Sequence, residues 1–154
     1  METLITFFSR YGSTKKSAEY LSEKIKGSIV IDLRQNEPNI NSFKNIIIGG
    51  AIYNGKLCGQ VKQFLKINQN ALKDKKLFIY INCVTAQSFN EVVKRDIPPQ
   101  LVDCAEKIVF ASGTLPNRIS LADKFRFACV KSKIRGLPEF KIDYTALDEI
   151  ATEI

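Results

Sequence analysis

The sequence predicts an α/β protein in which a parallel sheet lies between two layers of helices. Three observations support this fold class. Five short hydrophobic runs, rich in Ile, Val or Phe, recur along the 154 residues. These runs do not alternate with polar residues, which is typical of strands that are buried on both faces. Segments with helical periodicity lie between several of the runs, and this succession favours a parallel sheet with helices on both faces.

The elements are expected in the following order. The hydrophobic runs predict strands at 4–8, 29–33, 46–48, 77–81 and 108–111. Apolar residues at helical spacing predict helices at about 14–26 and 57–68, with weaker patterns at 89–93 and 101–104. A polar stretch at 34–42 separates the second strand from the third.

Residues 1–154 are expected to form a single domain, because this length is enough for one full core. Hydrophobic residues make up 45% of the chain and charged residues 25%, which is ordinary for a globular protein. The hydrophobic runs are too short to span a bilayer. The N-terminus passes directly into the first strand and lacks the parts of a signal peptide. We therefore expect a cytoplasmic protein.

The cysteine and histidine content limits the chemistry that side chains can perform. The four cysteines are Cys58, Cys83, Cys104 and Cys129. They form no CxxC pair, so free and mostly buried thiols are expected rather than a metal site or disulfides. The chain has no His, which excludes Ser–His and Cys–His hydrolases. No metal site and no catalytic side chain are predicted. In an enzyme, either a cofactor or Lys, Tyr and carboxylates would supply the chemistry.

The first strand ends in a loop that is suited to bind phosphate. The loop Ser9–Thr14 carries three hydroxyl side chains besides its tyrosine, and Gly12 lets the backbone approach a ligand. The helix that follows begins with N–H groups that have no partner within the helix. Lys15 and Lys16 in its first turn oppose the helix dipole, and an anion in the loop would ease that conflict. The alternative is an ordinary strand–turn–helix unit with Ser13 as the N-cap.

Two further loops are expected at the same edge of the sheet, because ligands of such sheets bind at the carboxyl ends of the strands. Residues 49–55 follow the third strand and carry three glycines and one tyrosine. Residues 82–87 follow the fourth strand. Tyr53, exposed at a strand end, is suited to stack on a planar ring. The alternative is a turn tyrosine that caps the core.

These three loops, in this order and spacing, resemble those of the flavodoxin superfamily, and the likeness covers nearly the whole chain. The resemblance implies a flavodoxin-like, doubly wound, five-stranded sheet with the strand order 2-1-3-4-5, and FMN as the cofactor. It implies that the FMN phosphate is held by Ser9, Gly12, Ser13 and Thr14 together with the backbone N–H groups of Arg10 and Tyr11.

The same resemblance assigns the other two loops to the flavin ring. The second loop, which would flank the ring, contains Ala51, Ile52, Tyr53, Asn54 and Gly55. Tyr53 would stack on the ring, and the two residues after it would approach flavin N5. The third loop, which would meet the pyrimidine edge of the ring or the ribityl chain, contains Asn82, Cys83, Val84 and Thr85.

Within this superfamily the sequence most resembles the menaquinone-dependent protoporphyrinogen IX dehydrogenase type. A segment after the fifth strand supports this most, because simple electron-carrier flavodoxins lack it. In this segment Asp123-Lys124-Phe125 matches an Asp-basic-Phe pattern, and Gly136 ends a helix expected over about 115–136. One departure is Asn54, because the family tends to have an aromatic residue directly before the glycine at position 55.

The chain carries a net charge of +7, whereas carrier flavodoxins look strongly acidic. Much of the excess lies in the segment 115–136, where Asp123 is the single acid and the basic residues are Arg118, Lys124, Arg126, Lys131, Lys133 and Arg135. A basic amphipathic helix can lie on an anionic membrane surface or receive a carboxylate-bearing substrate. The alternative is a helix packed on the core with a solvated basic face. No basic platform with interleaved aromatic residues is present, so nucleic acid is not an expected partner.

The leading functional hypothesis is an FMN-dependent oxidoreductase that resembles protoporphyrinogen IX dehydrogenase. The flavin would take hydride equivalents from an anionic macrocycle and a quinone would reoxidise it, so the protein supplies binding, orientation and electrostatics. The alternative is a flavodoxin-type electron carrier that docks on redox-protein partners. The intact loops argue against a fold that has lost its cofactor, and the sequence lacks the motifs of P-loop NTPases and receiver domains. The expected location is the cytoplasm, or the inner face of the membrane if the basic helix binds lipid.

Overall fold

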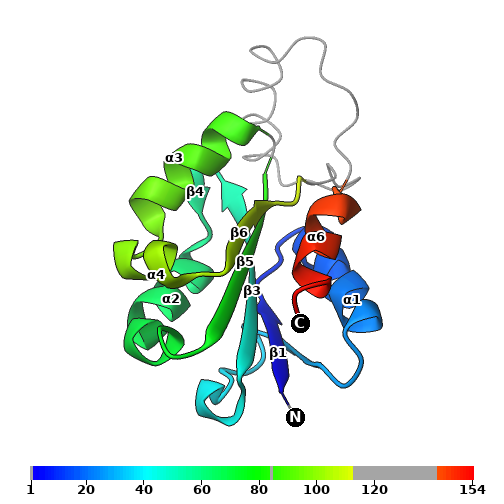
Figure 1. The fold of residues 1–154 in the computed structure, drawn as a ribbon. Coiled ribbons are helices and arrows are strands. Elements are labelled where there is room, and N and C mark those ends of the chain that lie inside the picture. Colours follow the sequence, from blue (N-terminus) through cyan, green and yellow to red (C-terminus); the bar gives the residue numbers. More distant parts are fainter. Residues whose placement is uncertain (1, 84, 113–141) are drawn as a thin grey trace.

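Five parallel strands form the main sheet of the computed structural model, in the order β2-β1-β3-β5-β6 (Figure 1). They are β1 (Thr3–Phe7), β2 (Ile29–Asp32), β3 (Asn45–Tyr53), β5 (Lys76–Asn82) and β6 (Lys107–Phe110). The predicted fold class and strand order are confirmed, since β5 and β6 are the fourth and fifth parallel strands along the chain. The structure describes residues 2–83, 85–112 and 142–154, so the helix expected over about 115–136 lies outside the described residues.

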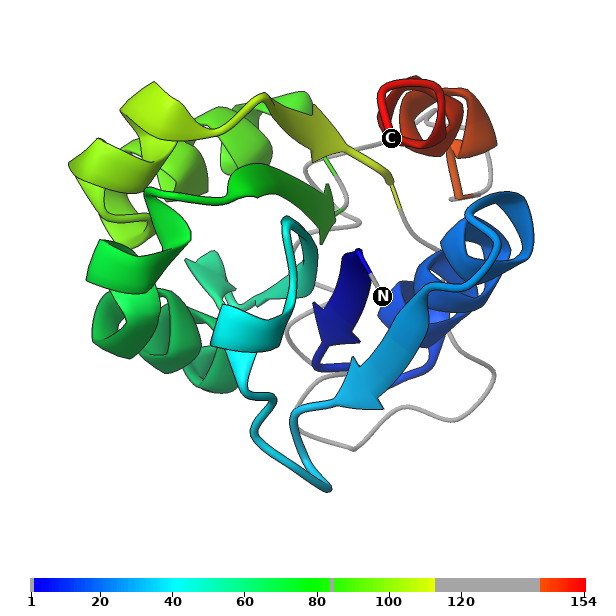
Figure 2. The ribbon, with the colours of Figure 1, turned by 60° about the horizontal axis from the view of Figure 1, so that its bottom comes forward.

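Helices cover both faces of this sheet (Figure 2). One layer consists of α1 (Ser13–Lys24) and α6 (Tyr144–Ala151). The other layer consists of α2 (Gly59–Leu72), α3 (Ala86–Asp96) and α4 (Pro99–Cys104). A short 3-10 helix, η1 (Ile40–Ser42), precedes β3. Within the described ranges, no helix is long and apolar enough to cross a membrane.

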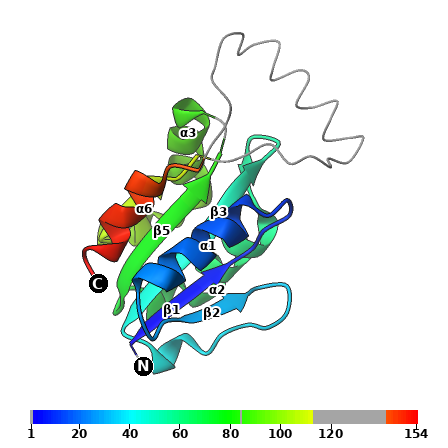
Figure 3. The same ribbon diagram turned by 90° about the vertical axis from the view of Figure 1, so that its right-hand side faces the viewer.

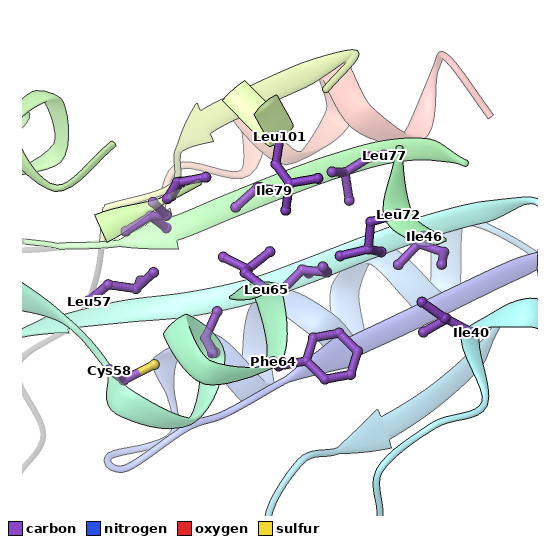
Figure 4. Packing of buried hydrophobic residues seen from close by; sticks show 14 of the residues in the cluster. Ile40, Ile46, Leu57, Cys58, Phe64, Leu65, Leu72, Leu77, Ile79 and Leu101 are labelled. Carbon is purple, nitrogen blue, oxygen red and sulfur yellow. The ribbon is translucent and has the colours of Figure 1, made fainter. Parts of the chain in front are cut away.

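Each face of the sheet has its own hydrophobic core, because successive residues of a strand point to opposite faces. On β3, Ile46 and Ile48 pack in the core beneath α2, whereas Ile47 packs in the core beneath α1 and α6. Phe64 and Leu65 of α2 close the first of these cores (Figure 4). The three isoleucines are fully buried. Burial on both faces is why the strands show no polar alternation in the sequence.

The third strand is longer than predicted and contains most of the loop that was expected at 49–55. Residues 49–53 continue β3, and the first three of them pair with β5 from Gly49↔Tyr80 to Ala51↔Asn82. Glycines are unfavourable in strands, so their presence in the sequence indicated a loop. Gly49 is needed here for packing, because a Cβ at this position would lie 2.1 Å from a carbon of the Tyr80 ring. The loop therefore shrinks to its last two residues.

A short strand that was not predicted, β4 (Lys56–Leu57), pairs antiparallel with the end of β3. The turn between them consists of Asn54 and Gly55, whose φ angles are 55° and 71°. Two consecutive residues with positive φ are the backbone of a type I′ hairpin turn. The helix expected from residue 57 consequently begins two residues later, at Gly59.

The helix α6 was also not predicted, although its sequence carries a start signal. Asp143 caps the helix by accepting a hydrogen bond at 3.2 Å from the N–H three residues later. Leu147 and Ile150 are fully buried in the core that α6 shares with α1. Tyr20 of α1 donates a hydrogen bond of 2.7 Å to Asp148, which ties the two helices together.

Candidate cofactor-binding site

The three predicted loops lie at one end of the molecule, where β1, β3 and β5 end (Figure 3). β3 is the common neighbour, since it pairs in parallel with both β1 and β5. Parallel neighbours end at the same edge of a sheet, which is where ligands of such folds bind. The loop after β1, the turn after β3 and the segment before α3 are therefore adjacent in space.

The loop between β1 and α1 has the backbone of an anion-binding turn. Gly12 is the N-cap of α1 and has a φ of 101° and a ψ of −13°. Its N–H donates to Ser9 Oγ at 2.9 Å, and its carbonyl accepts from the N–H of Lys16 at 2.9 Å. No side chain of the described residues caps this helix. The N-cap is thus Gly12 and not Ser13, and the N–H groups of the first turn are left for a ligand.

Tyr53 joins the second predicted loop to the first. The backbone N–H of Arg10 donates to Tyr53 Oη at 2.9 Å. The rings of Tyr53 and Tyr11 meet edge to face, with centroids 6.0 Å apart, and the Arg10 guanidinium lies 5.4 Å from the Tyr11 centroid and 5.9 Å from that of Tyr53. Tyr53 is half-buried rather than exposed, and burial raises the pKa of Tyr53 to about 12. The Tyr53 hydroxyl thus accepts from the N–H of Arg10, which the flavodoxin resemblance assigns to the FMN phosphate.

A fully buried tyrosine supports the first turn of α1 from inside the sheet. Tyr80 on β5 donates from Oη to the carbonyl of Thr14 at 2.9 Å, and its ring packs on Gly49 of β3. Burial raises the pKa of Tyr80 well above its ordinary value, so the hydroxyl stays a neutral donor. Tyr80 could not be recognised from the sequence, because a tyrosine inside a hydrophobic run indicates only a strand.

The third predicted loop begins with a residue that is used inside the protein. Asn82 is 2% exposed. Its Nδ2 donates to the carbonyl of Ser112, and it also lies 3.4 Å from both Ser17 Oγ and the carbonyl of Ala111. These contacts link the end of β5 to α1 and to the end of β6. The amide nitrogen of Asn82 therefore has partners in the chain, and contact of this residue with a cofactor stays a prediction.

The rest of the third loop leads into α3. Cys83 is buried, and burial raises the pKa of its thiol to about 12. Thr85 caps α3 by accepting at Oγ1 from the N–H of Ser88 at 3.1 Å. Val84 lies outside the described residues. Thr85 thus has a structural role as the N-cap of α3, and Cys83 is buried in the protein. The roles of both residues toward a ligand stay predictions.

The second loop is held from the end of α3 by a charged pair that the sequence did not reveal. Arg95 donates from Nη2 to the carbonyl of Gly55 at 2.6 Å. Asp96, which is almost fully buried, accepts from the N–H of Leu57 at 3.0 Å. Hydrogen bonds from Arg95 hold the pKa of Asp96 well below its usual range. Charged residues at the end of an amphipathic helix normally indicate a solvated surface, so no signal pointed to this pair.

Two residues of the second predicted loop belong to β3 itself. Ala51 is buried, and its carbonyl accepts from the N–H of Cys58 at 2.9 Å. Ile52 is half-buried and pairs with Leu57 of β4. These two residues shape the wall of the hairpin, whereas Tyr53 and the two-residue turn form its tip.

The polar groups at this edge fit a cofactor that carries a phosphate and other polar atoms. Among the described residues, four buried side-chain oxygens lack a hydrogen-bond partner. Three of them belong to the predicted loops: Tyr11 Oη, Thr14 Oγ1 and Asn82 Oδ1. Buried polar atoms without hydrogen-bond partners are unfavourable. They therefore mark places where a ligand or a water molecule can supply the hydrogen bond. Together with the N–H groups at the start of α1, they suit a polar, anionic ligand.

Comparison with solved structures supports the fold. Flavodoxin 1 from Bacillus cereus is 16% identical and has a TM-score of 0.55, over 90% of this chain and 100% of that one. A flavoprotein in complex with FMN from Lactobacillus acidophilus is 17% identical, with a TM-score of 0.50 over 72% of this chain and 90% of that one. The rubredoxin oxygen:oxidoreductase of Desulfovibrio gigas is 14% identical, with a TM-score of 0.56 over 88% of this chain, which spans only 37% of that protein.

The sequence itself was also compared with known families and proteins. No curated protein matches the chain. A model of the flavodoxin domain family matches residues 4–138, which include all three loops and the segment 115–136. This match covers most of the sequence and agrees with the strand order and with the loops at the carboxyl edge of the sheet. The chain belongs to the flavodoxin domain family.

Proposed function

We propose that this chain binds FMN at the carboxyl edge of its sheet and works as an FMN-dependent oxidoreductase. The observation that carries the proposal is the meeting of the first two loops. The start of α1, opened by Gly12, lies directly beside Tyr53 through the bond between Arg10 N–H and Tyr53 Oη. The residues proposed for the phosphate and the aromatic residue proposed for the ring are thereby neighbours, which supports the proposal. FMN is the cofactor that the family match and the FMN-bound Lactobacillus flavoprotein support.

The chain's own groups divide into those for the phosphate and those for the ring. Ser9, Gly12, Ser13 and Thr14 would hold the phosphate together with the N–H groups of Arg10 and Tyr11. Tyr53 would lie against the ring. Asn54 and Gly55 would lie near it, and Asn82 to Thr85 would meet its other edge or the ribityl chain. When bound, FMN supplies the electron and hydride transfer that a chain without His lacks.

Phosphate binding at the first loop requires one exchange of partners. Tyr53 Oη accepts from Arg10 N–H in this structure, so the hydroxyl must release that group before a phosphate oxygen can take it. A bond to an anionic oxygen is shorter and roughly twice as strong as a neutral one. The exchange is therefore favourable, and it leaves the Tyr53 ring free to lie on the flavin.

For the reaction itself, we propose two-electron oxidation of an anionic substrate of the protoporphyrinogen type, with a quinone as the acceptor. The resemblance of the segment after β6 and the net charge of +7 support this assignment. Contact of that segment with an anionic membrane surface, and a location at the inner face of the membrane or in the cytoplasm, are parts of the same proposal. The alternative is an electron carrier for a redox-protein partner, which the full-length likeness to the Bacillus cereus flavodoxin supports.

Cofactor binding is tested first, on the purified full chain. The protein is titrated into FMN while the flavin fluorescence is followed, and FAD serves as the matched control ligand. Quenching by FMN at a lower concentration than by FAD is expected, and heat should release FMN from the loaded protein. A protein that quenches neither flavin would overturn the proposal.

The reaction is tested next, on the FMN-loaded protein. Protoporphyrinogen IX is supplied with a menaquinone analogue, and porphyrin fluorescence is followed against protein-free and quinone-free controls. Quinone-dependent formation of porphyrin is expected. Tight FMN binding without porphyrin formation would reject the dehydrogenase assignment and leave the electron carrier.

A further inference from the structure

The turn between β3 and β4 is held in place by a side chain from outside the predicted loops. Gly55 occupies the second position of this turn and has a φ of 71°. Its carbonyl accepts from Arg95 Nη2 at 2.6 Å, so a cation fixes the direction of this peptide group. Without that contact, the carbonyl of a glycine in a two-residue turn would be among the easiest in the protein to reorient.

A buried carboxylate holds Arg95 in position. Arg95 donates from Nε and Nη2 to the two oxygens of Asp96, at 3.0 and 2.8 Å. The Asp96 side chain is 1% exposed and also accepts from the N–H of Leu57 and from Lys62 Nζ, at 3.0 and 2.9 Å. A guanidinium held by two parallel bonds keeps a defined orientation, which a single contact would not impose. Arg95 and Asp96 together thus form a clamp that holds the turn at Gly55 and β4 at Leu57.

The clamp connects two of the three loops of the candidate site. α3 begins at Ala86, directly after its N-cap Thr85 in the third loop, and ends at Asp96, which is bonded to the hairpin. A helix is a rigid connection over this length. The position of the hairpin tip is therefore set by the same helix that leaves the third loop.

We propose that Arg95 is a positioning residue that keeps the Gly55 carbonyl directed toward α3 in every redox state of the cofactor. The proposal rests on the proposed function, in which the ring lies against Tyr53, two residues before Gly55. Uptake of one electron and one proton by a flavin already adds an N–H to the ring, and a free carbonyl beside the ring could accept from it. Because Arg95 already occupies this carbonyl, the one-electron-reduced state gains no such bond, and transfer in pairs is favoured.

The first test needs no flavin and compares three cofactor-free proteins. Wild type, Arg95→Gln and Lys62→Gln are compared by amide hydrogen exchange and mass spectrometry. Lys62 is the matched control, since it also pairs with Asp96 but makes no contact with Gly55. Exchange in the peptide 53–57 should be about tenfold faster in Arg95→Gln, and close to wild type in Lys62→Gln. Equal exchange in all three proteins would overturn the clamp.

The second test measures a spectroscopic signature of the FMN-loaded proteins. During photoreduction, the largest fraction of one-electron-reduced flavin should be about threefold higher in Arg95→Gln than in wild type or Lys62→Gln. Arg95→Lys keeps the charge but not the fork, and should lie between wild type and Arg95→Gln. Identical fractions in all four proteins would overturn the redox role. Failure of wild type to take up FMN would instead overturn the proposed function and this redox role together, while the exchange result would still decide the clamp.

Discussion

Tyr80 shows how one side chain can position a loop of the candidate site. It lies fully buried at the centre of the sheet, yet its hydroxyl reaches the first turn of α1 by donating to the Thr14 carbonyl at 2.9 Å. Room for its ring exists only because residue 49 on the neighbouring strand is a glycine. Gly49 and Tyr80 are thus one unit, and their joint effect is to set the height of the α1 N-terminus above the sheet.

Gly49→Ala is expected to lower the free energy of unfolding by about 1–3 kcal/mol, as overpacking of a core does. The cause is the added Cβ, which would lie 2.1 Å from the Tyr80 ring. In a Tyr80→Leu background the ring is gone, so the same substitution should cost less, with a coupling energy of about 1 kcal/mol or more. Urea denaturation of the four proteins of this cycle measures the coupling. Equal costs in both backgrounds would contradict the contact.

Tyr53→Phe is expected to reduce the loss of stability at alkaline pH. Burial raises the pKa of Tyr53 to about 12, above its ordinary value near 10, so the phenol ionises in the unfolded chain first. The stability due to the neutral phenol is therefore complete below about pH 10 and is lost as the pH rises to about 12. Denaturation between these values should show wild type losing about 2 kcal/mol more than the variant.

Tyr144→Phe is the control for this measurement, because Tyr144 is 43% exposed. Its stability curve should follow that of wild type across the alkaline range. A Tyr53→Phe curve that also follows wild type would show that the Tyr53 hydroxyl is not buried, since burial is the cause of its raised pKa.

Side-chain type revealed part of the site, and tertiary contacts determine the rest. The candidate phosphate loop and Tyr53 could be predicted because glycine, hydroxyls and an aromatic at strand ends have few other uses. Tyr80 and Arg95 could not be found in this way. Their roles depend on which backbone carbonyls lie opposite them, and these belong to residues 66 and 40 positions away in sequence.

At the scale of elements, the hairpin after β3 is the part of the site that the sequence mispredicted. Two glycines in succession indicated a loop at 49–55, although both lie in a strand that is paired on both sides. The dipeptide Asn54-Gly55 was the better signal, since Asn-Gly favours the type I′ turn that the structure contains. Propensity failed at residue 49 because a Cβ there would lie 2.1 Å from the Tyr80 ring of β5. At residue 50 a Cβ would lie 2.9 Å from Leu57 of β4 and 3.3 Å from Val61 of α2, so packing is also close there.

The variants Gly12→Ala and Gly27→Ala distinguish the contribution of α1 to protein stability from its proposed role in FMN binding. Both glycines have positive φ, 101° and 79°, and an added Cβ would meet no atom within 4 Å at either position. Each alanine should therefore cost about 1 kcal/mol through backbone strain alone. Only Gly12 opens α1 beside the proposed phosphate, so only Gly12→Ala should weaken FMN binding, by about tenfold or more. Thermal unfolding and flavin titration give the two quantities.

Gly27→Ala is the matched control, because it lies beyond the opposite end of α1. Similar losses of FMN affinity in the two variants would mean that strain in α1, and not a ligand at its N-terminus, governs binding. Unchanged affinity in both would remove the first loop from the site.

At the scale of the whole molecule, the sequence was most informative about the sheet. Five runs without polar alternation predicted strands buried on both faces. This is confirmed for β1, β3 and β5, which lie almost entirely buried between two cores, whereas the edge strands β2 and β6 are only partly buried. The residue types of a strand reflect its burial, so the layering could be inferred from the hydrophobic runs. The strand order was inferred from the flavodoxin resemblance. α6 escaped prediction because its eight residues bury only two side chains fully, Leu147 and Ile150.

The net charge of +7 leads to a last prediction about the FMN-loaded protein. Its phosphate removes about two of these charges, so the molecule stays cationic. Reoxidation by ferricyanide, an anion, should slow severalfold as salt rises, because the screening length falls from about 30 Å at 0.01 M to about 8 Å at 0.15 M. A neutral, water-soluble quinone is the control acceptor and should show little dependence on salt, since steering acts only on charged partners.

Stopped-flow measurement of flavin absorbance gives both rates. Six of the chain's 23 basic residues lie in the segment 115–136, between β6 and α6 in the sequence. A strong salt dependence for ferricyanide alone would place much of the positive charge close to the flavin, as an enzyme for anionic substrates requires. Equal salt dependence for both acceptors would contradict electrostatic steering, and would favour a role in which the basic segment acts away from the cofactor.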